Sequence, residues 1–315
     1  MNRLASVTTV AAFAALCAGA ASAQAPVPPS KWGPNDEIGA ANYMTPETAL
    51  KAAKLIKTGK VYSLGITVST TTPAYPPRTC SIYIVQPGQT GSADGLGPTK
   101  TTYNDDILNC WNGIGTQLDG LGHIGVGDRY YNGNKWGEFA TIGGLKKLGA
   151  DKVPPMVARA VMLDMAAHYG VEVVKEGTAF NRAEIEAVAK KQGVEIQQGD
   201  IVIFHTGWLS LIEKDPKRFG SVEPGLGREG ARYLVSKGVV AVGADTWAVE
   251  AIPFEPGAGV FEVHQILLPM SGTYILENIN TAELAKDKAY EFMFILGQNK
   301  YQGSVQSMIN PVGIR

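Results

Sequence analysis

The second half of the chain alternates between continuous apolar runs and amphipathic stretches. Apolar runs of about four to eight residues are typical of strands buried on both faces, whereas amphipathic stretches that begin with a capping residue are typical of helices. The strands predicted in this way cover residues 158–165, 200–208, 239–246 and 289–296, and the helices between them cover 181–193, 227–238 and 281–287. This alternation predicts an α/β fold, a mixed domain in which helices pack on a sheet.

The first half of the chain has a weaker pattern. Residues 45–59 are predicted as a helix because Thr45 is a good N-cap and a proline follows at the first helical position. Residues 61–68 are predicted as a strand. Residues 71–110 are rich in threonine, proline and glycine, so we expect loops there around one short strand at 80–85.

The beginning of the chain has the pattern of an export signal. Residues 1–23 combine a basic start at Arg3, an apolar stretch too short to span a bilayer and a small-residue cleavage site. We therefore expect cleavage after Ala23 and a periplasmic or secreted protein. Residues 24–30 are predicted to be a flexible segment ahead of one domain over residues 31–315.

Charge and cysteine content narrow the function classes. The net charge of −1 offers no basic surface for nucleic acid, and no later apolar run is long enough for a transmembrane helix. We expect a small-molecule substrate, with no nucleic acid and no membrane after signal removal. Cys80 and Cys110 can pair in an oxidising compartment, but the sequence does not show whether they are close, and free thiols are an equal alternative.

Two stretches match the glycine pattern of dinucleotide-binding sites. Residues 120–125 read Gly-Leu-Gly-His-Ile-Gly, and residues 225–230 read Gly-Leu-Gly-Arg-Glu-Gly with Asp245 further along the chain. The fingerprint requires a strand directly before the glycines, which gives a tight turn into the helix. Neither stretch has one, so a nicotinamide-dependent oxidoreductase is the least favoured interpretation.

A group of metal-ligand residue types surrounds the first of these glycine-rich stretches. Gln117 and Asp119 share one face if the chain is locally extended, and His123 follows after two glycines. Carboxylate and imidazole together suit a divalent cation such as zinc or manganese. Distant residues usually complete such a site, and His264 and Glu277, next to apolar segments, are the candidates.

Around these residues the sequence resembles the cyclase or bacterial kynurenine formamidase-like family of metal-dependent hydrolases. The family motif H-x-G-T-H-x-D-x-P-x-H begins at Gly113, which replaces its first histidine. Gly115, Thr116, Asp119 and His123 match the motif, while Gln117 replaces the second histidine and Leu121 the proline. The stretches 31–47, 119–133, 199–208 and 242–250 are also similar to family blocks.

The resemblance implies a single mixed domain of the kynurenine formamidase-like (swivelling β/β/α) type and a homo-oligomer. The family has a two-metal site, but two of its histidines are absent here, so we expect one divalent ion, zinc or manganese. Its expected ligands are Asp119, His123, His264 and Glu277, with Gln117 as a weak ligand or a hydrogen-bond donor. Relatives with glutamine at this position form a recognisable subset of the family.

The predicted function is hydrolysis of a small amide, cyclic amide or lactone by metal-activated water. Glu277 or Asp119 is expected to take the proton of the water, and His264 to protonate the leaving atom unless the metal occupies it fully.

Trp111, Trp208 and Trp247 flank the predicted site segments and are candidates for an aromatic-lined pocket. Trp111 and Trp208 are expected to bind substrate, as is His205 at the end of a buried strand. The alternative is an exported, non-catalytic small-molecule-binding protein on the same fold, which the replacement of two motif histidines by Gly113 and Gln117 would favour.

Overall fold

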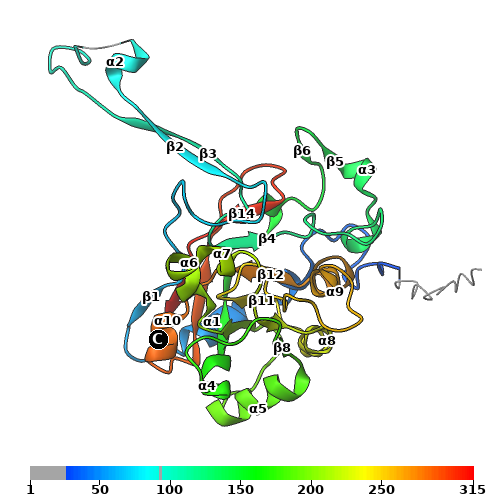
Figure 1. Cartoon of the computed structure of the whole chain (residues 1–315). Coiled ribbons are helices and arrows are strands. Elements are labelled where there is room, and N and C mark those ends of the chain that lie inside the picture. The colour runs from blue at the N-terminus through cyan, green and yellow to red at the C-terminus, as the bar shows by residue number, and fades with distance from the viewer. Residues whose placement is uncertain (1–25, 92–93) are drawn as a thin grey trace, which may run out of the picture.

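The structure is a computed structural model that describes residues 26–91 and 94–315. Its centre is a nine-stranded mixed sheet with the strand order β1-β15-β13-β7-β9-β11-β12-β4-β14 (Figure 1). The α/β fold expected from the alternating pattern is therefore confirmed. The predicted signal peptide at 1–23 lies outside the described residues.

Four parallel strands form the middle of the sheet: β7 (Met156–Asp164), β9 (Ile201–His205), β11 (Ala241–Ala244) and β12 (Tyr274–Glu277). Their side chains are almost completely buried, as their continuous apolar sequences predict. The polar residues at their ends, such as His205 and Glu277, therefore lie at the border of a rigid hydrophobic core.

Antiparallel strands extend the sheet on both sides. β4 (Gln117–Asp119) and β14 (Gln306–Met308) follow β12, while β13 (Glu291–Leu296), β15 (Val312–Ile314) and β1 (Val61–Ser63) follow β7. The short β4 lies between two partners, so its backbone is fixed from both sides. This strand carries two of the residues on which the predicted site depends.

The longer helices pack against the sheet and against one another. α1 (Pro46–Ala53) contacts β7 and β13, α5 (Arg182–Gln192) contacts β7, and α9 (Glu262–Ser271) contacts β12. α8 (Arg228–Lys237) contacts both α5 and α9. The N-terminus of α5 is capped as predicted, since the Glu184 carboxylate accepts a hydrogen bond from the Asn181 backbone N–H.

Short elements connect these parts. They are the helices α2 (Pro87–Thr90), α3 (Trp136–Phe139), α4 (Met165–Tyr169), α6 (Leu211–Lys214), α7 (Pro216–Phe219) and α10 (Ala282–Lys286), the strands β5 (Ala140–Thr141), β6 (Gly144–Leu145), β8 (Ala179–Phe180) and β10 (Gly225–Leu226), and 3₁₀ turns at Gly39–Tyr43, Tyr131–Gly133, Ala150–Lys152 and Trp208–Ser210. In the described part of the chain, no helix combines the length and apolar character needed to cross a membrane.

A two-stranded arm projects from the body of the molecule (Figure 1). It consists of β2 (Cys80–Val85) and β3 (Asp105–Cys110), with α2 near its tip. The sulfur atoms of Cys80 and Cys110 are bonded at its base, so the pairing that the sequence left open is a disulfide. The pattern predicted only β2, because β3 carries two aspartates and an asparagine, which are poor strand formers.

Two predicted elements are shorter than expected. The helix predicted at 45–59 ends at Ala53, where the N–H of Leu55 bonds three residues back instead of four. The strand predicted at 61–68 ends at Ser63, opposite Val312. The preceding residue of the partner strand is Pro311, which has no N–H to continue the ladder.

Candidate metal centre

Strand pairing brings four polar side chains together around β4. Gln117 lies directly opposite Glu277 of β12, and Asp119 lies directly opposite Gln306 of β14. Gln117 and Asp119 are two residues apart on one strand, so they share a face of the sheet, as predicted. All four side chains are buried.

His264 reaches the same place from the first turn of α9. Its Nδ1 lies 2.5 Å from Oε1 of Glu250, and its backbone N–H donates to the same oxygen at 3.2 Å. Glu250 is itself buried and therefore fixes both the beginning of α9 and the imidazole ring. With Nδ1 held in this way, Nε2 is the ring atom that faces Asp119 and Glu277.

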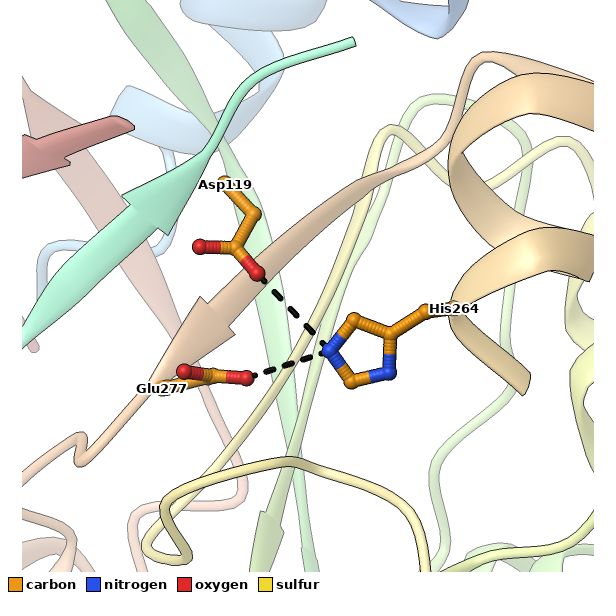
Figure 2. A group of neighbouring side chains, drawn as sticks. All are labelled: Asp119, His264 and Glu277. Atoms are coloured by element: carbon orange, nitrogen blue, oxygen red, sulfur yellow. Dashed lines mark ion pairs between the residues drawn. The ribbon is translucent and has the colours of Figure 1, made fainter. Parts of the chain in front are cut away.

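Asp119, His264 and Glu277 form a compact group that can hold a metal ion (Figure 2). One ligand atom of each residue lies within 4.8 Å of the other two. His264 Nε2 is 3.3 Å from Glu277 Oε1 and 3.8 Å from Asp119 Oδ2. The structure thus brings together residues about 150 positions apart in the chain, as expected from their residue types and the family resemblance.

The two glutamines bind the outer oxygens of these carboxylates. Gln306 Nε2 donates to Asp119 Oδ1 at 2.6 Å, and Gln117 Nε2 donates to Glu277 Oε2 and, at 3.4 Å, to Asp119 Oδ1. Gln117 is therefore arranged as a hydrogen-bond donor to both carboxylates, one of the two roles expected for it. Asp119 Oδ2, which faces the histidines, is buried without a hydrogen-bond partner among the described residues.

The unpartnered Asp119 Oδ2 indicates whether a cation would fit this position. A buried carboxylate oxygen without a partner is costly, and a metal ion satisfies it directly. The donor set consists of carboxylate oxygens and imidazole nitrogen, which are ordinary ligands of zinc and manganese. The residues present fit a divalent cation.

His123 lies at the rim of the group. Its Nε2 is 3.7 Å from Asp119 Oδ2, and its side chain is partly exposed, whereas His264 is buried. It is not among the three residues that lie mutually close. Its assignment as a fourth ligand remains a prediction.

Burial and charge shift the pKa values in this group. Burial raises the pKa of Glu277 to about 8, together with the negative charge of Asp119, while His264 and Arg78 oppose the shift. Burial alone would lower the pKa of His264, but hydrogen bonds to Glu250 and Glu277 raise it to about 10. Burial lowers the pKa of His123, against the opposing charge of Asp119.

A pocket of about 130 Å³ opens onto the metal group and is lined by His123, His264 and Glu277. Its wall is largely aromatic. Tyr75 stacks on Trp247 with ring centroids 5.7 Å apart, and Phe261 lies edge-on to Tyr75 at 6.1 Å. This is a space for a small, flat molecule beside the metal group.

The two tryptophans expected to bind substrate lie elsewhere. Trp208 is fully buried against Leu211 and Phe219, and its Nε1 donates to the Phe219 carbonyl. Trp111 is 51% exposed at the end of β3, and neither indole lines the pocket. Trp208 is therefore part of the hydrophobic core, and the tryptophan that lines the pocket is Trp247.

His205 faces a different and larger cavity of about 840 Å³. Its Nδ1 lies 2.7 Å from Thr281 Oγ1 and 3.5 Å from Asp245 Oδ2. Asp245 is held by the backbone N–H groups of Thr206 and Gly207. The structure does not bring His205 to the metal group, because its strand ends beside a cavity that shares no lining residue with the smaller pocket.

Three residues near the site were missed in the sequence. Glu250 follows a buried strand as an acid among apolar residues, which was an available signal. Gln306 and Arg78 had none, because only strand pairing places Gln306 beside Asp119 and only the fold places Arg78 in the pocket.

Comparisons with known proteins identify relatives of the chain by family and by fold. The pattern that defines the Cyclase family matches residues 62–251 of the chain. A crystal structure described as a novel cyclase is 32% identical, with 91% of this chain and 98% of that chain covered and a TM-score of 0.82. No curated protein matches the chain.

Two more distant structures share the fold. Isatin hydrolase A from Ralstonia solanacearum is 19% identical, covers 86% of this chain and 98% of its own, and has a TM-score of 0.62. A potential metal-dependent hydrolase with cyclase activity is 16% identical, covers 81% and 98%, and has a TM-score of 0.52. The resemblance noticed in the sequence is confirmed, and the chain belongs to the Cyclase family.

Proposed function

We propose that the protein is a metal-dependent hydrolase that cleaves the C–N or C–O bond of a small amide, cyclic amide or lactone. The observation that carries this proposal is the convergence of Asp119, His264 and Glu277, with one carboxylate oxygen left without a partner. The names of the structural neighbours, which are hydrolases and cyclases, support the same reaction class.

The residues of the chain have separate tasks in this proposal. A divalent ion, zinc or manganese, supplies Lewis-acid activation of water and of the substrate carbonyl when it is bound. Asp119, His264 and Glu277 would hold the ion, with His123 at the rim of the group. Gln117 and Gln306 keep the carboxylates aligned, since their amides occupy the outer oxygens.

We assign proton transfer to Glu277 rather than to His264. The Nδ1 of His264 is held by Glu250, and its Nε2 points to the metal group, so neither nitrogen is free to protonate a leaving atom. Glu277 also lines the pocket, and its carboxylate keeps lone pairs beyond those used by the Gln117 amide and the metal position, so it is the group that can accept a proton from water.

The aromatic wall and the small volume favour a compact cyclic substrate. Isatin, a cyclic amide named in the structural neighbour, is the first compound to test. N-formyl amides and lactones complete the screen because they present the same kind of carbonyl to water.

The experiment is to purify the protein, measure bound metal per chain and screen these compounds with and without a chelator. We expect turnover that chelator abolishes and that Glu277→Gln reduces by at least about 100-fold, with Glu283→Gln, a surface change, as the matched control. Activity that ignores chelator would reject the metal mechanism.

The second candidate is an exported binding protein without catalysis. Gly113 and Gln117, which offer no metal-binding imidazole, are the observations that favour it. A loaded metal together with tight ligand binding and no turnover on any of the compounds would support this candidate instead.

We also propose that the protein is exported and forms a homo-oligomer. The N-terminal signal pattern supports export. The projecting arm supports assembly, because it carries four apolar side chains that are each about half-exposed: Ile82, Tyr83, Ile84 and Ile107. Peptide mapping of the mature N-terminus and size-exclusion chromatography test the two points.

A further inference from the structure

Arg78 lies beside the metal group, and its guanidinium forms no direct ion pair with a carboxylate of the described residues. It precedes the arm, lines the pocket that contains His264 and Glu277, and is partly buried. Its Nη1 donates to the carbonyl oxygen of Gly113 at 2.9 Å. Among residues 26–91 and 94–315, no carboxylate forms an ion pair with it and no second acceptor is bonded to it. A guanidinium has five N–H donors, so most of them lack a protein partner.

The backbone at Gly113 makes room for this guanidinium. A Cβ atom at that position would lie 2.7 Å from Arg78 Nη1 and 2.7 Å from Gln306 Oε1. Both distances are too short for non-bonded atoms, so a larger residue would displace the guanidinium. The missing side chain at Gly113 is therefore the condition for the placement of Arg78.

The charge of Arg78 reaches the centre of the site. Arg78 lines the same pocket as His123, His264 and Glu277. The acidic groups nearby interact with other partners. Glu250 binds His264, and the carboxylates of Asp119 and Glu277 face the metal position. A ligand anion in the pocket can therefore take the N–H donors of Arg78 that the described residues leave unused.

The rest of the pocket indicates what carries that anion. Tyr75, Trp247 and Phe261 form an aromatic wall, and the volume of about 130 Å³ is close to that of an apolar cavity able to hold one benzene ring. A flat ring against this wall would have its substituents between the metal group and Arg78.

We propose that Arg78 binds the carboxylate of small aromatic acids, and that the substrates are the aromatic amides or lactones from which such acids are released. The inference rests on the proposed function for the origin of the acid. In that reaction the oxygen of water joins the carbonyl carbon, the C–N or C–O bond breaks, and the amine or alcohol leaves with a proton. The acid loses its proton to become a carboxylate, whose two oxygens match the planar fork of arginine.

The test compares a charged and a neutral probe of the same shape, benzoate and benzamide, on the metal-loaded protein. Calorimetry reports binding without any need for turnover. We expect Arg78→Met to weaken benzoate binding by about 10- to 100-fold and benzamide binding by less than about 2-fold. Arg129→Met is the matched control, because Arg129 also donates to a glycine carbonyl at 2.9 Å but lies outside the pocket.

Two results would overturn the inference. If Arg78→Met weakens both probes equally, the arginine only supports the backbone at Gly113. If benzoate binding is unchanged, its carboxylate binds elsewhere. Arg78→Lys, which keeps the charge but not the fork, replaces the methionine variant if that one does not fold, and we expect it to lose part of the benzoate preference. A failure of the hydrolase proposal gives a different result. Benzoate would still bind through Arg78, but the protein would cleave no amide or lactone.

Discussion

Gln117 and Glu277 are direct partners across the antiparallel pair of β4 and β12, and the amide of one donates a hydrogen bond to the carboxylate of the other. The same amide contacts Asp119. One neutral side chain therefore holds both acidic residues of the metal group, so a residue that replaces a histidine of the family motif remains part of the site.

This arrangement predicts that Gln117→Ala weakens the binding of zinc or manganese. Loss of such a supporting hydrogen bond typically costs about 10- to 100-fold in metal affinity. Gln298→Ala is the control, since Gln298 is also buried but donates to the carbonyls of Ala150 and Val153, away from the site. Titration calorimetry with each ion measures the difference, and an unchanged affinity in Gln117→Ala would contradict the supporting role.

Metal binding should also raise the stability of the folded protein. An ion that binds only the folded state adds about 2.7 kcal/mol when its free concentration is about 100 times the dissociation constant. We expect Asp119→Asn to lose most of this gain in thermal unfolding with and without chelator. Asp245→Asn changes an equally buried aspartate in the other cavity and should keep the ion-dependent gain even if its own stability is lower. A gain that survives in Asp119→Asn would place the ion elsewhere.

The pH dependence of stability should show that the pKa of Asp200 is raised in the folded protein. Burial raises the pKa of this carboxyl to about 6 in the folded protein, although Gln197 and Arg159 both donate hydrogen bonds to it. Because the folded pKa lies above the ordinary value of 3.8, the folded state binds the proton more tightly. The contribution of this group to the free energy of unfolding therefore rises as the pH falls from about 6 to about 4 and is absent above that window.

Urea unfolding at a series of pH values tests this sign. We expect the slope of stability against pH to be more negative in the wild type than in Asp200→Asn within that window. Asp287→Asn is the control with the opposite shift, because Lys60 lowers the pKa of Asp287 and its effect lies below pH 3.8. Identical slopes in the wild type and Asp200→Asn would show that Asp200 stays ionised.

The parts of the fold that sequence could predict are those with a local cause. The buried strands β7, β9, β11 and β13 and the helices α5 and α8 follow from apolar runs and capping residues, and all of them are present. The strand β3 has no such signal, because it is exposed and exists only through pairing with β2 and the disulfide at its base. Its apolar residues Ile107 and Leu108 are adjacent and both exposed, so β3 lacks the alternation of buried and exposed positions that marks a half-buried strand.

The residues of the site also divide into those that the sequence could predict and those that only the fold brings into place. Asp119, His264 and Glu277 were found because their residue types and the family resemblance pointed to them, and the structure brings them together. The histidine of β9, His205, has equally suggestive chemistry but ends beside another cavity. Arg78 was missed since a lone arginine in a proline-rich loop carries no pattern, and only its place in the fold gives it a role.

The two tryptophans provide a last prediction, because one supports the core and the other the pocket. Trp208 is fully buried, and its replacement by alanine leaves a large cavity, so we expect a loss of about 3 to 5 kcal/mol in unfolding free energy. Trp247 stacks on Tyr75 at the pocket wall, so Trp247→Ala should weaken an aromatic ligand such as benzoate by about 10-fold, through lost ring contact. Calorimetric binding and urea unfolding of both variants separate the two effects. Because Trp247 packs against the cluster that contains Trp208, some loss of affinity is expected in Trp208→Ala as well. If Trp247→Ala left benzoate affinity unchanged while folded, the wall assigned to Tyr75 and Trp247 would be wrong.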